Sequence, residues 1–304
     1  MTRLAVERRD FLRATGAGVL LAGAGPVLLG ACSTTDPGKE TQGGGTLEKA
    51  KSAGSISIGF ANESPYGYTD ASGKLTGEAP ELARVIFKAL GINEVKGVQV
   101  DFGGLIAGLN AKRFDIVAAG MFITPERCQQ VAFSEPEYCG LTGFLVPKGN
   151  PDDITKLEDV AAKPDFKIGV MTGAVEKGYA EGAGVRADQI EVFNDQTAAF
   201  EGLEAERVGA VCLTAISLRD VLKKHPGAPF EVTAPYAPKV DGKEQFGCGG
   251  FAFRKGDKDL LDAFNAELKK LKDGNKLLPI IQPFGFTEAE LPGEHTAAEL
   301  CGAG

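Results

Sequence analysis

Residues 102–127 read FGGLIAGLNAKRFDIVAAGMFITPER, and this stretch decides the fold. The pattern of apolar residues predicts a helix over 105–112 and a buried strand over 114–119. Thr124 is of a type that caps helix N-termini, and Pro125 suits a first helical turn, so a second helix is expected to begin there. A helix, a strand and a helix in close succession indicate an α/β fold.

The same alternation of short apolar strands and helical segments extends outward from this stretch. Strands are predicted over residues 55–61, 98–102, 167–170, 190–193 and 210–213. Helices are predicted over residues 80–90, from 175, over 197–207, over 217–224 and along the apolar positions from 260 to 271. We therefore expect an α/β protein in which helices flank mainly parallel sheets.

Two stretches are expected to carry the chain between two lobes. Residues 141–146 are apolar and end in Pro147-Lys-Gly-Asn-Pro151, which stops any regular element. The Gly-interrupted apolar stretch over 246–253 is expected to cross back. The predicted first lobe therefore spans 47–146 plus 247–304, the second spans 147–246, and the ligand cleft lies between them.

Residues 1–31 are predicted to be an export signal. Their uncharged run from Ala14 to Ala31 is too short and too rich in glycine for a stable membrane-spanning helix. Arg8-Arg9-Asp10-Phe11-Leu12 places two arginines ahead of that run and resembles the twin-arginine signal of proteins exported in the folded state. An ordinary signal peptide is the alternative.

The apolar run ends in Leu29-Gly-Ala-Cys32, which resembles a lipobox, where the cysteine thiol is diacylated and becomes the new N-terminus. Two acyl chains give durable membrane attachment, whereas one gives only marginal binding. A leader cleaved nearby, with Cys32 incidental, is the alternative. Residues 32–46 are expected to form a flexible tether, because Gly, Thr and Ser predominate. The protein is thus expected at the cell surface or in the periplasm, lipid-anchored at Cys32.

Charge and length narrow the class of protein. The whole chain carries a net charge of -8, and removing residues 1–31, with four arginines and two acidic residues, takes this to -10. So acidic a protein is not expected to bind nucleic acid. The remaining chain is long enough for two packed lobes.

Five cysteines follow the lipobox, and an oxidising compartment permits disulfides among them. The expected pairs are Cys128 with Cys139, which flank one short segment, and Cys248 with Cys301. Sequence cannot fix this connectivity, and free buried thiols are the alternative. The absence of a CxxC pair or a histidine cluster in the sequence argues against a metal site.

Residues 102–127, followed by VAFS at 131–134, closely resemble the polar-amino-acid type, family 3, of the solute-binding proteins of ABC transporters. The resemblance continues more weakly over 54–290 and implies a type II periplasmic-binding-protein fold, two lobes that close on a small zwitterion. It also implies that Arg127 grips the ligand carboxylate, as a planar guanidinium near a helix N-terminus is suited to do. The alternative is a surface arginine paired with Glu135 or Glu137.

Three segments, 61–68, 120–128 and 173–176, resemble the branch that binds ectoine and hydroxyectoine. This likeness implies an aromatic box of Tyr66, Phe102 and Phe122, each near the C-terminal end of a predicted strand. Ectoine carries a delocalised amidinium, which favours aromatic faces. Glu63 is positioned to accept hydrogen bonds from the ring N–H groups. Each aromatic, taken alone, is as well explained as part of a core.

Three further residues complete the predicted site. Gly120 lies in the second of the resembling segments. Thr214 stands where many relatives carry an aspartate for an α-ammonium group, which disfavours ordinary amino acids, and its alternative role is to cap the next helix. Asp195 or Glu244 could supply the missing charge instead. The backbone around Val175, between a strand and a helix, could meet an anion, or it is a purely structural turn.

The sequence therefore predicts a substrate-binding lipoprotein of an ABC importer for ectoine or 5-hydroxyectoine. The resemblance implies permease and ATPase subunits as partners, and we expect a monomer without cofactor, metal or enzymatic activity. One alternative is a binding protein for another polar amino acid or a betaine. The other is a dehydratase-like enzyme on the same fold, with Glu63 as general acid.

Overall fold

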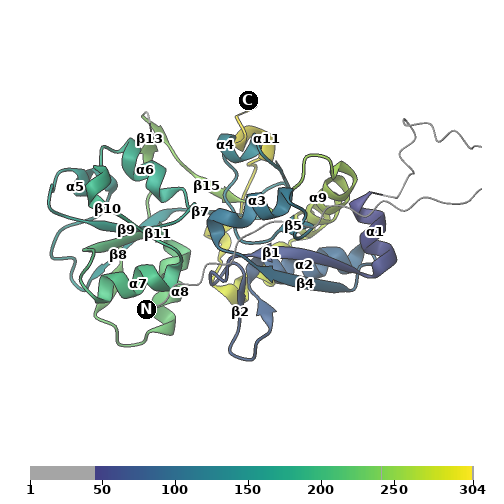
Figure 1. Ribbon diagram of the computed structural model, residues 1–304, viewed down its shortest axis with the longest axis horizontal. Coiled ribbons are helices and arrows are strands. Elements are labelled where there is room, and N and C mark those ends of the chain that lie inside the picture. Colours follow the sequence, from purple (N-terminus) through teal and green to yellow (C-terminus); the bar gives the residue numbers. More distant parts are fainter. Residues whose placement is uncertain (1–44, 241, 303–304) are drawn as a thin grey trace, which may run out of the picture. The chain divides into compact units, whose positions relative to one another are not determined.

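The computed structural model describes residues 45–240 and 242–302 (Figure 1). The predicted export signal, the lipidation site at Cys32 and almost all of the predicted tether lie outside the described residues. None of the helices in the described part of the chain has the length and hydrophobicity that crossing a membrane would require.

The first lobe is built on a five-stranded sheet of order β4-β1-β5-β16-β6. Its strands are β1 (Ser55–Phe60), β4 (Glu94–Gln99), β5 (Ile116–Val117), β6 (Ala132–Phe133) and β16 (Ala252–Phe253). Strand β1 pairs in parallel with β4 and β5, whereas β16 runs antiparallel to β5 and β6. The sheet is therefore mixed, and its β16 strand comes from the chain's return to this lobe.

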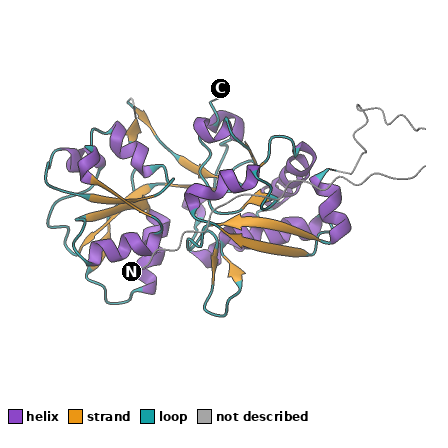
Figure 2. Ribbon diagram, in the orientation of Figure 1, coloured by secondary structure: helices purple, strands orange, loops and turns teal. Residues whose placement is uncertain are grey.

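Helices flank this sheet (Figure 2). They are α1 (Thr46–Ala53), α2 (Glu78–Ala89), α3 (Leu105–Asn110), α4 (Pro125–Cys128), α9 (Lys258–Asp273) and α10 (Leu277–Ile281), with a 3-10 turn η1 (Phe102–Gly104) before α3. The long helix α9 packs Phe264 against Phe87 of α2 and against Phe251 and Phe253, with ring centroids 4.6 to 5.6 Å apart. Burying each such side chain stabilises the fold by roughly 1.5–3 kcal/mol.

The second lobe contains a five-stranded sheet of order β10-β9-β11-β8-β12. Its strands are β8 (Thr142–Pro147), β9 (Ile168–Met171), β10 (Ile190–Phe193), β11 (Ala210–Thr214) and β12 (Phe230–Val232), and its helices are α5 (Leu157–Ala161), α6 (Glu176–Gly182), α7 (Gln196–Glu204) and α8 (Ala215–Lys224), with a 3-10 turn η2 (Ala187–Gln189). Strands β9, β10 and β11 are parallel, and β8 and β12 are antiparallel to their neighbours.

Smaller elements complete the chain. Short antiparallel ribbons are formed by β2 (Tyr68–Thr69) with β3 (Leu75–Thr76) and by β13 (Lys239–Val240) with β14 (Lys243–Glu244). After α10 come the 3-10 turns η3 (Gln282–Phe284) and η4 (Glu288–Glu290) and the last helix, α11 (Ala297–Leu300).

The chain passes between the two sheets along a two-stranded ribbon, and this corrects one expectation. Strand β7 (Tyr138–Gly140) leads out of the first lobe and pairs antiparallel with β15 (Gly247–Gly249), which leads back. Strand β8 already pairs with β11 and β12 of the second sheet, so the crossing precedes Pro147. The Pro- and Gly-rich punctuation at 147–151 ends a strand of the second lobe and does not mark the crossing.

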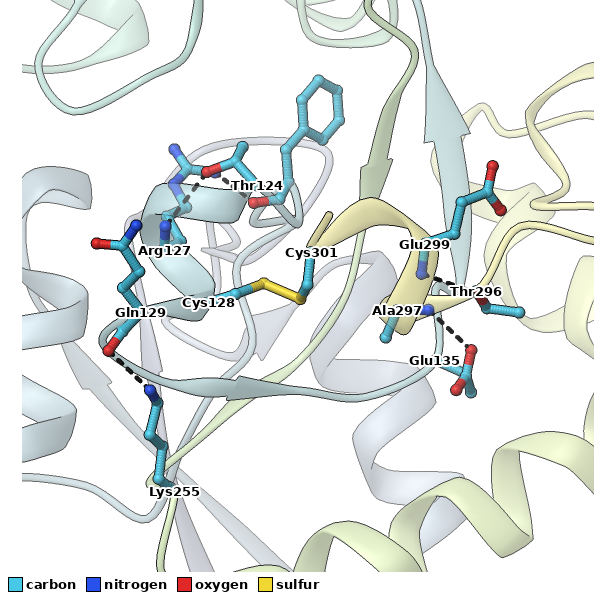
Figure 3. Close-up of a disulfide and its surroundings, with 11 residues drawn as sticks. Thr124, Arg127, Cys128, Gln129, Glu135, Lys255, Thr296, Ala297, Glu299 and Cys301 are labelled. Carbon is cyan, nitrogen blue, oxygen red and sulfur yellow. Dashed lines mark hydrogen bonds between the residues drawn. A yellow bond between two sulfur atoms is a disulfide. The ribbon is translucent and has the colours of Figure 1, made fainter. Parts of the chain in front are cut away.

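The predicted disulfide connectivity is wrong. Cys139 and Cys248 stand directly opposite each other on the β7–β15 ribbon and are bonded, and Cys128 is bonded to Cys301 (Figure 3). Cys128 lies on α4 and Cys139 on β7, so their closeness in sequence does not bring their side chains together. Cys212 is a buried free thiol within β11.

One predicted strand is displaced. The edge strand β4 runs from Glu94 to Gln99, whereas it was expected over 98–102, and Phe102 begins the turn η1. None of the β4 residues is fully buried, so the strand lacks the apolar pattern that reveals a strand in sequence. The displacement matters because it places Phe102 at a turn beyond the strand end.

Two carboxyl groups of the first lobe are buried. Glu78 begins α2 and Glu137 immediately precedes β7, and among the described residues neither carboxyl group has a hydrogen-bond partner. Burial raises the pKa of both carboxyls, and the charge of Glu137 raises that of Glu78 further. Because the folded protein keeps protons that an unfolded glutamate loses near pH 4.5, stability should fall as pH rises above that value.

Replacing Glu137 by glutamine tests this account. Glu137→Gln removes the cost of ionising a buried carboxyl, so its free energy of unfolding should exceed the wild-type value at about pH 8 and approach it at acidic pH. The gain should be about 1.4 kcal/mol for each unit by which the pKa of Glu137 is raised. Urea denaturation across pH measures it. Glu48→Gln, on the exposed side of α1, is the control, and parallel pH profiles for Glu137→Gln and wild type would contradict the prediction.

Candidate ligand-binding cleft

A cleft lies between the two lobes, at the ends of β1, β5, β9 and β11. Its lining contains all eight residues that the sequence predicted for the site, Glu63, Tyr66, Phe102, Gly120, Phe122, Arg127, Val175 and Thr214. The structure adds Tyr138, Met171, Ala174, Glu176 and Leu213. The residues predicted from the sequence thus line one cleft.

One wall of the cleft is aromatic. The Tyr138 ring lies 5.4 Å from the Tyr66 ring and 6.0 Å from the Phe122 ring. Phe102 stands apart from this group, with its ring 5.5 Å from the guanidinium carbon of Arg127. Tyr138 was missed because it lies on the connecting strand β7, which the sequence analysis assigned to neither lobe's site.

Glycines stand behind the aromatic side chains and allow them to lie flush with the backbone. Gly120 has a φ of +58°, and a Cβ there would collide with the ring of Tyr66. A Cβ on Gly247 would overlap the ring of Phe122. Gly120 therefore shapes the cleft by making room, and only glycine adopts this conformation readily.

Arg127 is presented by the four-residue helix α4. Thr124 caps this helix as predicted, since its Oγ1 accepts a hydrogen bond from the Arg127 backbone N–H at 3.3 Å. The guanidinium donates to Phe122 O at 2.6 Å and, across the cleft, to Gly173 O at 2.9 Å. Burial lowers the pKa of Arg127. The alternative pairing with Glu135 is not found, because the Glu135 carboxylate accepts the Ala297 N–H.

Two carboxyl groups face the cleft from opposite lobes. Glu63 follows β1, is 7% exposed and accepts a hydrogen bond from Ser217 Oγ at 3.2 Å. Burial, assisted by the charge of Glu176, raises the pKa of Glu63 to about 8. Burial raises the pKa of Glu176 to about 7, against the opposing effects of its own backbone N–H and of Arg127. The cleft can therefore accommodate an anion at Arg127 and a cation near the two carboxyls.

Glu176 is the functional candidate that the sequence analysis passed over. It is the first residue of α6, directly after Val175 at the N-cap, and only 2% of it is exposed. The signal available in the sequence was an acidic residue at the junction of a predicted strand and a predicted helix. The residue also lies within the 173–176 segment that carries the resemblance. The sequence pattern gave no sign that it would face Glu63.

Thr214 does not cap the next helix with its side chain. It occupies the N-cap position of α8 but makes no side-chain capping bond, and its Oγ1 lies 2.6 Å from the Tyr66 hydroxyl. The hydroxyl of Thr214 thus faces the cleft. Asp195 instead caps α7 by accepting the Ala198 N–H, and Glu244 is exposed on β14, so neither lines the cleft.

Direct hydrogen bonds join the lobes beside the cleft. Gln196, on α7, donates from Nε2 to Ser64 O at 2.8 Å and to Ser217 Oγ at 2.6 Å, and Ser217 Oγ in turn contacts Glu63. The free volume of the cleft is about 30 Å³, close to that of a single water molecule. Entry of any larger solute therefore requires the lobes to separate.

A larger hollow of about 1060 Å³ lies on the first lobe between α9, α10 and the C-terminal segment. None of the predicted site residues lines it. Charged residues of both signs line it, and two of them, Lys269 and Asp273, pair with each other. The cleft between the lobes remains the candidate site.

The family follows from comparison with known proteins. Residues 56–287 match the model of the bacterial extracellular solute-binding proteins, family 3. The chain belongs to this family. Its fold is accordingly the type II periplasmic-binding-protein fold of two lobes, and the predicted family and fold class are both confirmed.

Individual relatives agree with this assignment. A probable amino-acid ABC transporter periplasmic-binding protein of Sinorhizobium fredii (strain NBRC 101917 / NGR234), y4tE, is 36% identical over 261 residues, which is 84% of this chain and 86% of the relative. Among solved structures, EhuB in complex with hydroxyectoine has a TM-score of 0.77 and 39% identity, over 85% of this chain and 98% of EhuB.

A third relative is an ancestral amino acid-binding protein, AncCDT-1, described as a precursor of cyclohexadienyl dehydratase. Its structure has a TM-score of 0.69 and 30% identity, over 79% of this chain and 99% of the ancestral protein. Solute-binding proteins and an enzyme lineage thus share the fold of this chain.

The role of Gln196 in holding the lobes together can be measured. Gln196→Ala removes the donor to Ser64 O and should weaken closure by about 1–3 kcal/mol, the usual cost of leaving a buried polar group unpaired. Without added solute, the variant should show a larger radius of gyration than wild type in small-angle X-ray scattering. Gln245→Ala, which removes an exposed bond within β14 and its turn, is the control. Equal radii for Gln196→Ala and wild type would contradict this role.

Proposed function

We propose that the protein is the substrate-binding lipoprotein of an ABC importer and that it captures ectoine or 5-hydroxyectoine. The observation that carries this proposal is the combination of groups in one cleft, an aromatic wall, one guanidinium and two carboxyls. The similarity to EhuB, whose structure contains hydroxyectoine, supports the choice of ligand.

Each group matches one part of such a ligand. The carboxylate of ectoine would replace the backbone carbonyls of Phe122 and Gly173 as the partner of Arg127, giving a charge-assisted and bidentate pair. The delocalised amidinium would lie against the faces of Tyr66, Phe102 and Phe122. Aromatic faces bind a diffuse cation without the precise geometry that a primary ammonium group requires.

The two carboxyls would balance the positive charge of the ligand. Glu63 comes from the first lobe and Glu176 from the second, so a cation between them favours both ionisation and closure. Thr214, which pairs with Tyr66, carries a neutral hydroxyl, which suits a ligand whose nitrogens lie in a ring.

Capture would proceed by closure of the lobes. The ligand would dock on Arg127, Glu63 and the aromatic wall of the first lobe, and the second lobe would add Glu176 and the backbone around Val175. A ligand that contacts both lobes stabilises the closed state, which the permease then recognises. Attachment through acylated Cys32, after export by the twin-arginine signal, would keep the protein near its transporter.

Calorimetric titration of the purified protein with ectoine, hydroxyectoine, glycine betaine, glutamine and arginine tests the function. We expect tight binding of ectoine or hydroxyectoine and weak or no binding of the others. Tight binding of an amino acid alone would keep the solute-binding role and discard the ligand. No binding of any of the five would contradict the proposal as a whole.

The aromatic wall makes its own prediction. Phe122→Ala should weaken ectoine binding by roughly 1–2 kcal/mol, or about five- to thirtyfold, through loss of cation–π and packing contacts. Arg127→Ala should cost more, because a buried carboxylate would lose its partner. Phe246→Ala changes a side chain that is 50% exposed and should leave the affinity unchanged. Unchanged affinity of a folded Phe122→Ala protein, checked by its melting temperature, would rule out the aromatic box.

The raised pKa values of Glu63 and Glu176 predict the pH dependence of binding. A bound cation favours the carboxylate forms, so binding should release protons, and affinity should rise with pH through about 7 and 8 and then level off. Titrations in buffers of different ionisation enthalpy count the released protons. Glu63→Gln should flatten the profile, and a wild-type affinity independent of pH from 6 to 9 would refute the account.

One observation favours a second candidate. A carboxyl whose pKa is raised to about 8 is protonated near neutral pH and suits a general acid, and AncCDT-1 is described as a precursor of a dehydratase. On this reading Glu63 would donate a proton to a leaving hydroxyl. Incubating the protein with the solute panel and analysing the products by mass spectrometry separates the two, because a binding protein returns each solute unchanged.

A further inference from the structure

The disulfide between Cys128 and Cys301 joins the helix that carries Arg127 to the end of the chain. The two cysteines are separated by 173 residues, with Cα atoms 5.7 Å apart. Cys128 directly follows Arg127 on α4, and Cys301 directly follows α11 (Figure 3). The last segment of the chain is therefore covalently attached one residue away from the guanidinium of the cleft.

Helix α4 buries little surface of its own, and apart from the Thr124 cap it is held by the two bonds of the Arg127 guanidinium. It is four residues long and has no fully buried residue, and both Pro125 and Glu126 are exposed. A single helical turn of this kind is not stable by itself, since nucleation is costly and few bonds compensate. Its position, and with it the position of Arg127, must come from contacts with other segments.

The C-terminal strap, defined here as residues 288–302, supplies those contacts. Cys128, Leu300 and Cys301 pack against the same apolar cluster, which contains residues of both lobes. The backbone of Gly302 lies beside the ring of Pro125, which opens α4. One further bond comes from Lys255, which lies outside the strap. Its Nζ donates to Gln129 O, just after the helix, at 2.8 Å (Figure 3).

The C-terminal strap is itself anchored along its length. The Ala297 N–H donates to Glu135 Oε2 at 3.0 Å, and Thr296 caps α11 by accepting the Glu299 N–H at 3.2 Å (Figure 3). Glu290 pairs with Arg219 of α8, in the second lobe, at 3.7 Å. Within the first lobe the strap is thus bonded to Glu135 as well as to Cys128, so it can hold the helix attached to it.

We propose that the C-terminal strap, through the Cys128–Cys301 disulfide, positions Arg127 for the ligand carboxylate. The proposal rests on the proposed function, in which Arg127 binds that carboxylate. The strap holds α4 in place before the ligand arrives, so the free-energy cost of ordering the Arg127 side chain does not reduce the affinity for the ligand. Freeing α4 would add that cost, which corresponds to about tenfold in affinity for one immobilised side chain.

A double-mutant cycle separates positioning from general stability. The strap variant, Cys128→Ser with Cys301→Ser, should bind ectoine about tenfold more weakly than wild type, and adding Arg127→Ala to it should cost about tenfold less than in wild type. The comparison variant, Cys139→Ser with Cys248→Ser, loses the disulfide of the β7–β15 ribbon beside Tyr138 and can weaken binding on its own, but Arg127→Ala should cost as much there as in wild type. Equal cost of Arg127→Ala in all three backgrounds would overturn the proposal.

Amide hydrogen exchange gives a readout that needs no ligand. The N–H groups of Cys128 and Gln129 bond to Thr124 O and Pro125 O, so they report the integrity of α4. They should exchange at least about tenfold faster in the strap variant while the amides of α9 are unchanged. Unchanged exchange in α4 would overturn the strap's role, whether or not wild type binds any solute. Failure of wild type to bind any solute would count only against the proposed function.

A milder variant covers the case in which the strap variant does not fold. Glu135→Ala keeps both disulfides and removes only the acceptor of the Ala297 N–H. It should accelerate exchange in α4 and weaken ectoine binding by a smaller factor, of about two- to fivefold, consistent with one lost hydrogen bond. Wild-type exchange and affinity in a folded Glu135→Ala protein would speak against anchoring through the strap.

Discussion

The pairing of β7 with β15 is the constraint on which the rest of the molecule depends. Both passages of the chain between the sheets run through this ribbon, and the Cys139–Cys248 disulfide fixes its register. Tyr138, on β7, packs against the rings of Tyr66, Phe122 and Phe286. The connecting ribbon therefore also forms part of the cleft wall, so the path of the chain between the lobes and the shape of the cleft depend on the same residues.

The charges in the cleft impose a second constraint. Buried carboxyls at Glu63 and Glu176 face a single guanidinium, so the cleft is not electrically balanced when both carboxyls are ionised. Two responses are open to such a site, retention of protons or binding of a cation. Under the proposed function, the aromatic wall would select among cations, because aromatic faces attract a delocalised cation.

Much of the fold and the cleft could be predicted from the sequence, because the informative residues lie in local patterns. The helix after Gly104, the cap at Thr124 and the strand at 190–193 each follow from residues adjacent in sequence. The elements missed were those set by distant partners. Strand β4 has no apolar pattern, the disulfides join residues 109 and 173 positions apart, and β8 belongs to the second sheet through pairing with β11 and β12.

The same distinction explains what was missed in the cleft. Tyr66, Phe122 and Arg127 lie in the segments that carry the family resemblance, whereas Tyr138 reaches the cleft only because strand β7 runs between the lobes. Glu176 stands in a segment that the motif did identify, but its importance comes from Glu63, which is far away in sequence and opposite in space. Thr214 turned out to face Tyr66 because its backbone, and not its side chain, begins α8.

The two disulfides are nested, since the loop closed by Cys128 and Cys301 contains the one closed by Cys139 and Cys248. The whole second lobe is thereby enclosed in two covalent rings. A protease that cuts one peptide bond in any loop of that lobe releases no fragment, because each new end remains tied to the first lobe through sulfur. This topology therefore lets a nicked molecule stay in one piece.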